Sequence, residues 1–127
     1  MEVILAGPGN AGLSICLALA AAGHRVVGVL GQDYDELTAA SVLLPGVPWL
    51  EWHEPLPRAD LLILAVSDRA IPEVAERLAP GAGAVRGAVH LSGLTPVGAL
   101  GPLADVCPVG SFHPLQTLPN PRAGAAR

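Results

Sequence analysis

The first twelve residues, MEVILAGPGNAG, constrain the fold of this chain more than any other stretch. The apolar residues Val3–Ala6 lead directly into Gly7, Gly9 and Gly12, and a helix-forming run follows. In a G-x-G-x-x-G sequence the first glycine makes a tight turn from strand to helix, and the second lets the backbone approach a diphosphate. The third lets the helix pack close to the strand. The N–H groups at the start of that helix, together with the helix dipole, would favour an anion. The motif predicts a phosphate-binding turn if a strand–helix–strand unit surrounds it.

The residues after the glycines supply that surrounding unit. Leu13–Ala22 contains strong helix formers and is apolar almost all round, and Gly23 suits the C-terminal end of a helix. Val26–Leu30 is typical of a buried parallel strand. Because the helix is apolar on every side, we expect it to be covered by the sheet and by a second surface.

The segment after the second strand contains the residues that would distinguish between cofactors. Asp33 lies 21 residues after Gly12, and an acidic residue about 20 residues after the glycines holds the ribose 2′-hydroxyl in NAD-binding domains. Asp33 is equally well placed to cap the helix predicted after it. Gln32 precedes it at the same strand end. Arg25 lies at the opposite end of the strand, so no arginine for a 2′-phosphate is evident, and the choice between NAD and NADP stays open.

Strands and helices alternate through the rest of the chain. A short third strand is expected at Val47–Leu50, in a segment whose four prolines limit it to an edge element. The remaining expected elements are strands at 61–66, 88–93 and 106–112 and helices at 71–78 and 96–104. Ala65, Val66 and Ser67 end one of these strands, on the edge where open α/β sheets bind ligands. Ser67 could contact a cofactor there or cap the following helix.

Two polar side chains at the later strand ends are candidates for chemistry. Ser92 follows the fifth expected strand, and His113 follows the sixth. A histidine at this edge can act as a general acid or base in hydride transfer, and a serine can orient the reacting oxygen. The alternative is that His113 only bonds to loop backbone. His90, within a strand, is expected to be packed and hydrogen-bonded.

Composition excludes several other classes of function. A chain of 127 residues with 51% hydrophobic residues suits a single domain with a core. The net charge of −4, without any lysine, does not suit nucleic-acid binding. Apolar runs are too short to span a membrane, so we expect a cytoplasmic protein. Cys16 and Cys107 form no C-x-x-C pair, Cys16 is expected in the core, and no metal site is predicted.

Four segments together carry a resemblance to a known family. GPGNAG at 7–12, DLLILAVSDRAIPEVAERL at 60–78, VHLSG at 89–93 and GSFHPLQTL at 110–118 resemble a bacterial family of Rossmann-like oxidoreductase homologues. That family is related to deazaflavin-dependent NADP reductases, pyrroline-5-carboxylate reductase and the 6-phosphogluconate dehydrogenase superfamily. The resemblance covers nearly the whole chain.

The alternation of strands and helices predicts an α/β, Rossmann-like, doubly wound and mostly parallel sheet of about six strands with helices on both faces. We expect an NAD(P)-binding domain over residues 1–118, followed by a loose tail at 119–127 that has no periodicity. The resemblance implies a nicotinamide cofactor, NADP or NAD, bound by Gly7, Pro8, Gly9, Asn10, Ala11 and Gly12 and by Ala65, Val66 and Ser67. Gln32 and Asp33 are added as cofactor candidates from their position after the second strand. The histidine of a similar segment in prephenate dehydrogenases is catalytic, and this points to His113, with Ser92 placed like a substrate-facing serine.

The chain also departs from that family. By comparison with that family, we expect this chain to lack the helical C-terminal domain that usually closes the cleft, and Gly31-Gln32 stands in place of the usual serine-arginine. We therefore hold two hypotheses. The first is an NAD(P)-dependent oxidoreductase acting on a small carbonyl or imine. The second is a catalytically silent dinucleotide-binding module that serves as a sensor or as part of an assembly. In either case we expect a homodimer, because the all-apolar first helix and the missing domain leave apolar surface that a second copy would bury.

Overall fold

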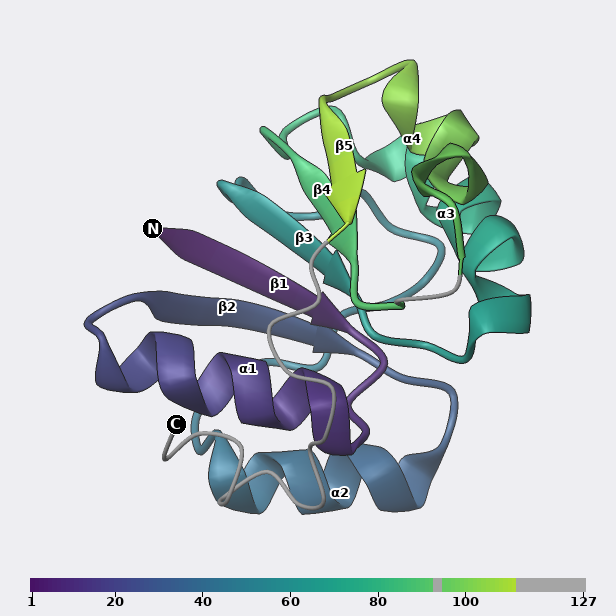
Figure 1. The fold of residues 1–127 in the computed structure, drawn as a ribbon. Coiled ribbons are helices and arrows are strands. Elements are labelled where there is room, and N and C mark those ends of the chain that lie inside the picture. The colour runs from purple at the N-terminus through teal and green to yellow at the C-terminus, as the bar shows by residue number, and fades with distance from the viewer. Residues whose placement is uncertain (93–94, 112–127) are drawn as a thin grey trace.

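The fold is an open parallel sheet with helices on both faces (Figure 1). The computed structural model describes residues 1–92 and 95–111. Within them the strands are β1 (Glu2–Ala6), β2 (Arg25–Leu30), β3 (Leu61–Leu64), β4 (Ala88–His90) and β5 (Val109–Ser111). The helices are α1 (Asn10–Ala21), α2 (Tyr34–Leu43), α3 (Ile71–Leu78) and α4 (Gly101–Ala104), with 3-10 turns at Asp68–Ala70, Ala79–Gly81 and Val97–Leu100. The strand order is β2-β1-β3-β4-β5, and every neighbouring pair is parallel.

The central strand β1 is apolar because both of its faces are buried. Val3 and Leu5 belong to the core under α1 and α2, whereas Ile4 and Ala6 belong to the core under α3 and α4. Figure 1 shows the two pairs of helices on opposite sides of the sheet. The structure thus confirms the predicted α/β, doubly wound and parallel architecture.

The expected third strand does not form, and a sixth strand is not confirmed. Segment 47–50 contributes one isolated parallel bridge, between Trp49 and Val29 of β2. The Val29 N–H donates to the carbonyl oxygen of Pro48 at 3.0 Å, and the Leu50 N–H donates to the carbonyl oxygen of Val29 at 2.8 Å. Pro48 has no N–H of its own to offer, and the surrounding prolines do not favour a longer ladder. The segment therefore lies beside β2 without extending the sheet.

The other strands lie where we expected them: β1 and β2 each begin one residue earlier, whereas β3, β4 and β5 are shorter than expected. β3 ends at Leu64 instead of Val66, because the chain turns there toward the 3-10 turn that precedes α3. β5 begins at Val109 instead of Val106, since the N–H groups of Val106 and Cys107 both donate to the carbonyl oxygen of Leu103 and prolong the turn after α4. Because the strands are parallel, the end of β3 and the start of β5 lie at opposite edges of the sheet, and the shortening of β3 places residues 65–67 in the loop at the carboxyl edge.

Helix α1 lies between the sheet and α2 (Figure 1). Leu13 and Cys16 are buried in the core, and Ile15 and Leu17 are half-buried against the same core. This arrangement agrees with the all-round apolar character of the helix, although its last residues, 20 and 21, are exposed.

The two cysteines are core residues, as we expected for Cys16. Both are free thiols in buried positions. Burial raises the pKa of the Cys16 thiol to about 12 and also raises the pKa of Cys107. A buried thiol with a raised pKa is a poor nucleophile, because the reactive form is the thiolate.

Within the described ranges 1–92 and 95–111, no helix combines the length and apolar character needed to cross a membrane. The same ranges contain no group of three or more His, Cys, Asp or Glu side chains arranged to hold a metal ion.

Candidate functional site

The loop between β1 and α1 is held tightly against the end of β3. Gly7 has a φ of +96°, and a Cβ added there would lie 2.8 Å from the backbone of Ala65. A Cβ at Gly12 would lie 2.7 Å from the Gly7 carbonyl oxygen and 2.9 Å from the Cβ of Ala65. The Gly7 N–H also donates to the carbonyl oxygen of Leu30 at 2.9 Å. The conformation and packing of the turn therefore require glycine at both positions.

Gly9 differs from the other two glycines of the motif. Its φ of −83° and ψ of −170° are extended values that any residue can adopt. A Cβ there would approach only the Oε2 atom of Glu36, at 3.6 Å, which is an ordinary contact distance. Gly9 is the N-cap of α1, and no side chain caps that helix. The protein itself thus leaves room above Gly9, beside the unpaired N–H groups at the start of α1.

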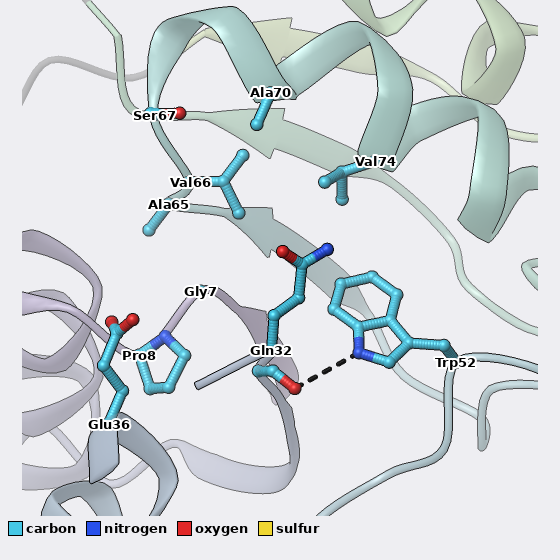
Figure 2. Close-up of a pocket in the computed structure, with 11 residues that line it drawn as sticks. Gly7, Pro8, Gln32, Glu36, Trp52, Ala65, Val66, Ser67, Ala70 and Val74 are labelled. Carbon is cyan, nitrogen blue, oxygen red and sulfur yellow. Dashed lines mark hydrogen bonds between the residues drawn. The ribbon is translucent and has the colours of Figure 1, made fainter. Parts of the chain in front are cut away.

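A cleft of about 280 Å³ opens at this edge of the sheet (Figure 2). It lies among the carboxyl ends of β1, β2 and β3, where open α/β sheets bind their ligands. The residues that line it are Gly7, Pro8, Gly31, Gln32, Glu36, Trp52, Ala65, Val66, Ser67, Ala70 and Val74. The volume is near the lower limit of ordinary ligand sites, roughly 300–1,000 Å³. The structure therefore brings together six of the predicted cofactor residues: Gly7, Pro8, Gln32, Ala65, Val66 and Ser67.

The other predicted cofactor residues lie beside the cleft and do not line it. Asn10, Ala11 and Gly12 form the first turn of α1. Asp33 is the N-cap of α2, and its Oδ1 accepts the N–H of Asp35 at 2.8 Å. The capping role that we weighed for Asp33 is thus present. Ser67 is the N-cap residue of the 3-10 turn Asp68–Ala70, where its carbonyl oxygen accepts the Ala70 N–H at 2.9 Å, but its side chain makes no capping hydrogen bond.

Trp52 forms a wall of the cleft that the sequence analysis missed. Its indole N–H donates to the carbonyl oxygen of Gly31 at 3.2 Å, the bond dashed in Figure 2. The guanidinium carbon of Arg77 lies 4.6 Å from the centre of the indole, a cation–π contact that supports the ring from α3. The only sequence signal was a tryptophan in a proline-rich segment, which does not reveal which strand end it reaches.

Glu36 was also missed, and within residues 1–92 and 95–111 it is the only ionisable side chain that lines the cleft. It follows Asp33 by one helical turn, so the capping of α2 by Asp33 places Glu36 near the glycine turn. Spacing along the sequence could not distinguish between Gln32, Asp33 and Glu36, because all three follow the same strand. Ala70 and Val74 complete the wall from the helical segment after β3. Of these two, only Val74 belonged to the helix expected at 71–78.

Ser92 is buried in a separate network at the end of β4. Its hydroxyl donates to the Thr95 hydroxyl at 3.0 Å and accepts the Thr95 N–H at 3.0 Å. The Ser92 N–H donates to Nδ1 of His90 at 3.1 Å, while Nε2 of His90 lies 3.3 Å from the carbonyl oxygen of Pro96. His90 is fully buried, which confirms the packed and hydrogen-bonded role predicted for it. Ser92 does not line the cleft. His113 lies outside the described residues.

Comparison with known families identifies the fold class of the chain. The Rossmann-like domain family matches residues 1–114. The chain belongs to that family. No curated protein sequence shows significant similarity to this Rossmann-like domain.

Several solved structures share the fold at low sequence identity. A protein from Bacteroides fragilis that is described as an NADP oxidoreductase superimposes with a TM-score of 0.76 at 24% identity, over 91% of this chain and 44% of the other. Biliverdin reductase from Synechocystis, solved with biliverdin and NADP⁺, gives 0.65 at 17% identity, over 88% and 37%. Prephenate dehydrogenase from A. aeolicus, solved with hydroxyphenyl propionate and NAD⁺, gives 0.65 at 17% identity, over 84% and 40%. The chain thus spans less than half the length of each of these proteins.

Proposed function

We propose that this Rossmann-like domain binds a nicotinamide dinucleotide and serves as the cofactor domain of an NAD(P)-dependent oxidoreductase. The observation that carries the proposal is Gly9. The fold needs no glycine there, since a Cβ would meet only the far end of Glu36 at 3.6 Å. A glycine at this position matters if a ligand's diphosphate approaches the backbone at the start of α1.

The position of the cleft favours binding of the adenosine half of the dinucleotide. It adjoins Gly9 and lies at the end of β2, where the adenosine ribose of a dinucleotide is recognised. Trp52 offers an aromatic surface for a base, and Val66, Ala70 and Val74 offer apolar contacts. Structures of similar fold are described as an NADP oxidoreductase and as complexes with NADP⁺ or NAD⁺. We assign the adenosine half of the dinucleotide to the cleft.

The proposed reaction is hydride transfer to or from a small carbonyl or imine. A bound nicotinamide would supply or accept the hydride. Ser92 and His113 stay our candidates for orienting the substrate and for moving the accompanying proton, because both follow strands at the same edge of the sheet.

A catalytically silent dinucleotide-binding module is the second proposal, and one observation favours it. The Ser92 hydroxyl is engaged with Thr95 both as donor and as acceptor, and it lies apart from the residues lining the cleft. In this arrangement Ser92 stabilises its own loop and is not free to bind a substrate.

Intrinsic fluorescence gives a direct test of dinucleotide binding. The chain has two tryptophans, of which only Trp52 lines the cleft. In a Trp49→Phe background, we expect NADH or NADPH to quench the remaining emission in a saturable way. Adding Gly9→Ala should weaken binding by about tenfold or more, because a Cβ there would crowd the diphosphate.

Gly83→Ala is the matched control, since a Cβ at Gly83 meets nothing within 4 Å. It should leave the affinity unchanged. If neither dinucleotide binds to the folded protein, or if Gly9→Ala binds as well as the control, the proposal fails. If a dinucleotide does bind, turnover of a panel of carbonyls and imines separates the two proposed functions, because binding without turnover supports the silent module.

A further inference from the structure

Among the described residues that line the cleft, a single side chain carries a charge, and that charge is negative. This side chain is Glu36, and Gln32 is the other long polar side chain of the set. Figure 2 shows Glu36 next to Pro8 on one side of the cleft, with Gln32 nearer to Trp52. Both residues follow β2, the strand whose end discriminates between dinucleotides with and without a 2′-phosphate.

The Glu36 carboxylate is free to accept hydrogen bonds from a ligand. It is exposed and makes no hydrogen bond or ion pair with any residue in 1–92 or 95–111. Its Oε2 faces the glycine turn, 3.6 Å from the position of a Cβ on Gly9. Asp33, the acidic residue that sequence spacing favoured, is instead engaged with the N–H of Asp35.

No cation among the lining residues would neutralise a 2′-phosphate. The sequence has no lysine. Arg25 lies at the opposite end of β2 beside Glu2, at 3.8 Å, and Arg77 lies over the Trp52 ring outside the lining set. Arg69 lies in the 3-10 turn between Ser67 and Ala70 but is not one of the lining residues. A phosphate dianion entering the cleft would therefore meet the Glu36 carboxylate without a compensating cation among the described lining residues.

We propose that this site selects dinucleotides with a free 2′-hydroxyl, NAD(H) over NADP(H), and that Glu36 is the residue that makes the selection. Its carboxylate accepts a hydrogen bond from a ribose hydroxyl and repels a 2′-phosphate. This inference rests on the proposed dinucleotide binding, and it differs from the NADP named for two of the structural neighbours.

The test compares NADH with NADPH in the Trp49→Phe background. We expect NADH to bind about tenfold tighter or more, because like charges placed together at an interface disfavour binding strongly. Glu36→Gln should narrow that ratio several-fold, mainly by strengthening NADPH. Added salt should also narrow it in the protein that retains Glu36, since an exposed charge is screened.

Asp35→Asn is the matched control, because it removes one exposed negative charge from the same turn of α2 without touching the cleft. It should leave the ratio within about twofold, since repulsion between exposed charges is weak at a distance. Melting temperatures establish that each variant is folded. NADPH binding that equals or exceeds NADH binding overturns the inference while dinucleotide binding stands, as does a ratio that Glu36→Gln leaves unchanged. Loss of binding for both ligands overturns the proposed function as well.

Discussion

At the scale of single residues, the three glycines of one motif have different physical roles. Position 7 requires glycine because its φ is +96°, and position 12 requires glycine because a Cβ there would lie 2.7 Å from the Gly7 carbonyl oxygen. Neither reason applies to Gly9. The sequence predicted the turn from the spacing of the three. It could not assign these separate roles, because they depend on how closely Ala65 of the β3 end approaches the turn.

This difference leads to a prediction about stability. Gly12→Ala should lower the free energy of unfolding by about 1–3 kcal/mol, because its Cβ would be forced against fixed backbone. Gly9→Ala should leave it within about 0.5 kcal/mol, since the added methyl group lies at an unstrained position. Urea denaturation followed by circular dichroism measures both. Equal destabilisation by the two substitutions would contradict the separation of roles.

At the scale of elements, the sequence located the helices and most strands but not their ends. The hydrophobic stripe of Ile71, Val74, Ala75 and Leu78 predicted α3 correctly, and these residues are buried. The end of β4 was not predictable in the same way. It is set by hydrogen bonds among His90, Ser92, Thr95 and Pro96, and hydrophobic periodicity does not report such bonds.

The end of β4 offers a second prediction about stability. Because the Ser92 N–H can only donate, Nδ1 of His90 is the acceptor, and Nε2 carries the proton directed at the Pro96 carbonyl oxygen. His90→Ala removes a fully buried ring and leaves both backbone groups without this partner. We expect a loss of about 2–4 kcal/mol in the free energy of unfolding.

His53→Ala is the control for that measurement, because His53 is exposed in the loop after Trp52. It should change stability by less than about 0.5 kcal/mol. Chemical denaturation of both variants makes the comparison. A His90→Ala protein as stable as His53→Ala would mean that the network does not fix the end of β4.

At the scale of the whole molecule, the order of apolar strands and helices was enough to predict a doubly wound parallel sheet. Only part of the lining of the cleft could be predicted. Residues next to the glycine motif and at the end of β3 were found from their position on strand ends. Trp52 and Glu36 were not, because the path of a proline-rich loop and the rotation of α2 about its axis are tertiary features.

Self-association stays a prediction at this scale. Tyr34 and Val42 on α2 are 71% and 76% exposed, and Trp49 is 41% exposed. Tyr34 and Trp49 also contact each other edge to face, with ring centres 5.7 Å apart. We expect sedimentation velocity at rising protein concentration to show a dimer. A sedimentation coefficient that stays at the monomer value throughout would contradict it.

The single bridge between Trp49 and Val29 has a consequence for how such a dimer could be built. A parallel sheet with an open outer strand can recruit the same strand of another molecule, which leads to continuous sheets and to aggregation. Here the backbone of Val29 is already bonded to Pro48 and Leu50, and a proline-rich segment lies along that strand. The β2 edge is thereby protected from intermolecular pairing. Two copies that associate on this side would have to meet through side chains, and the sheet would end within each subunit.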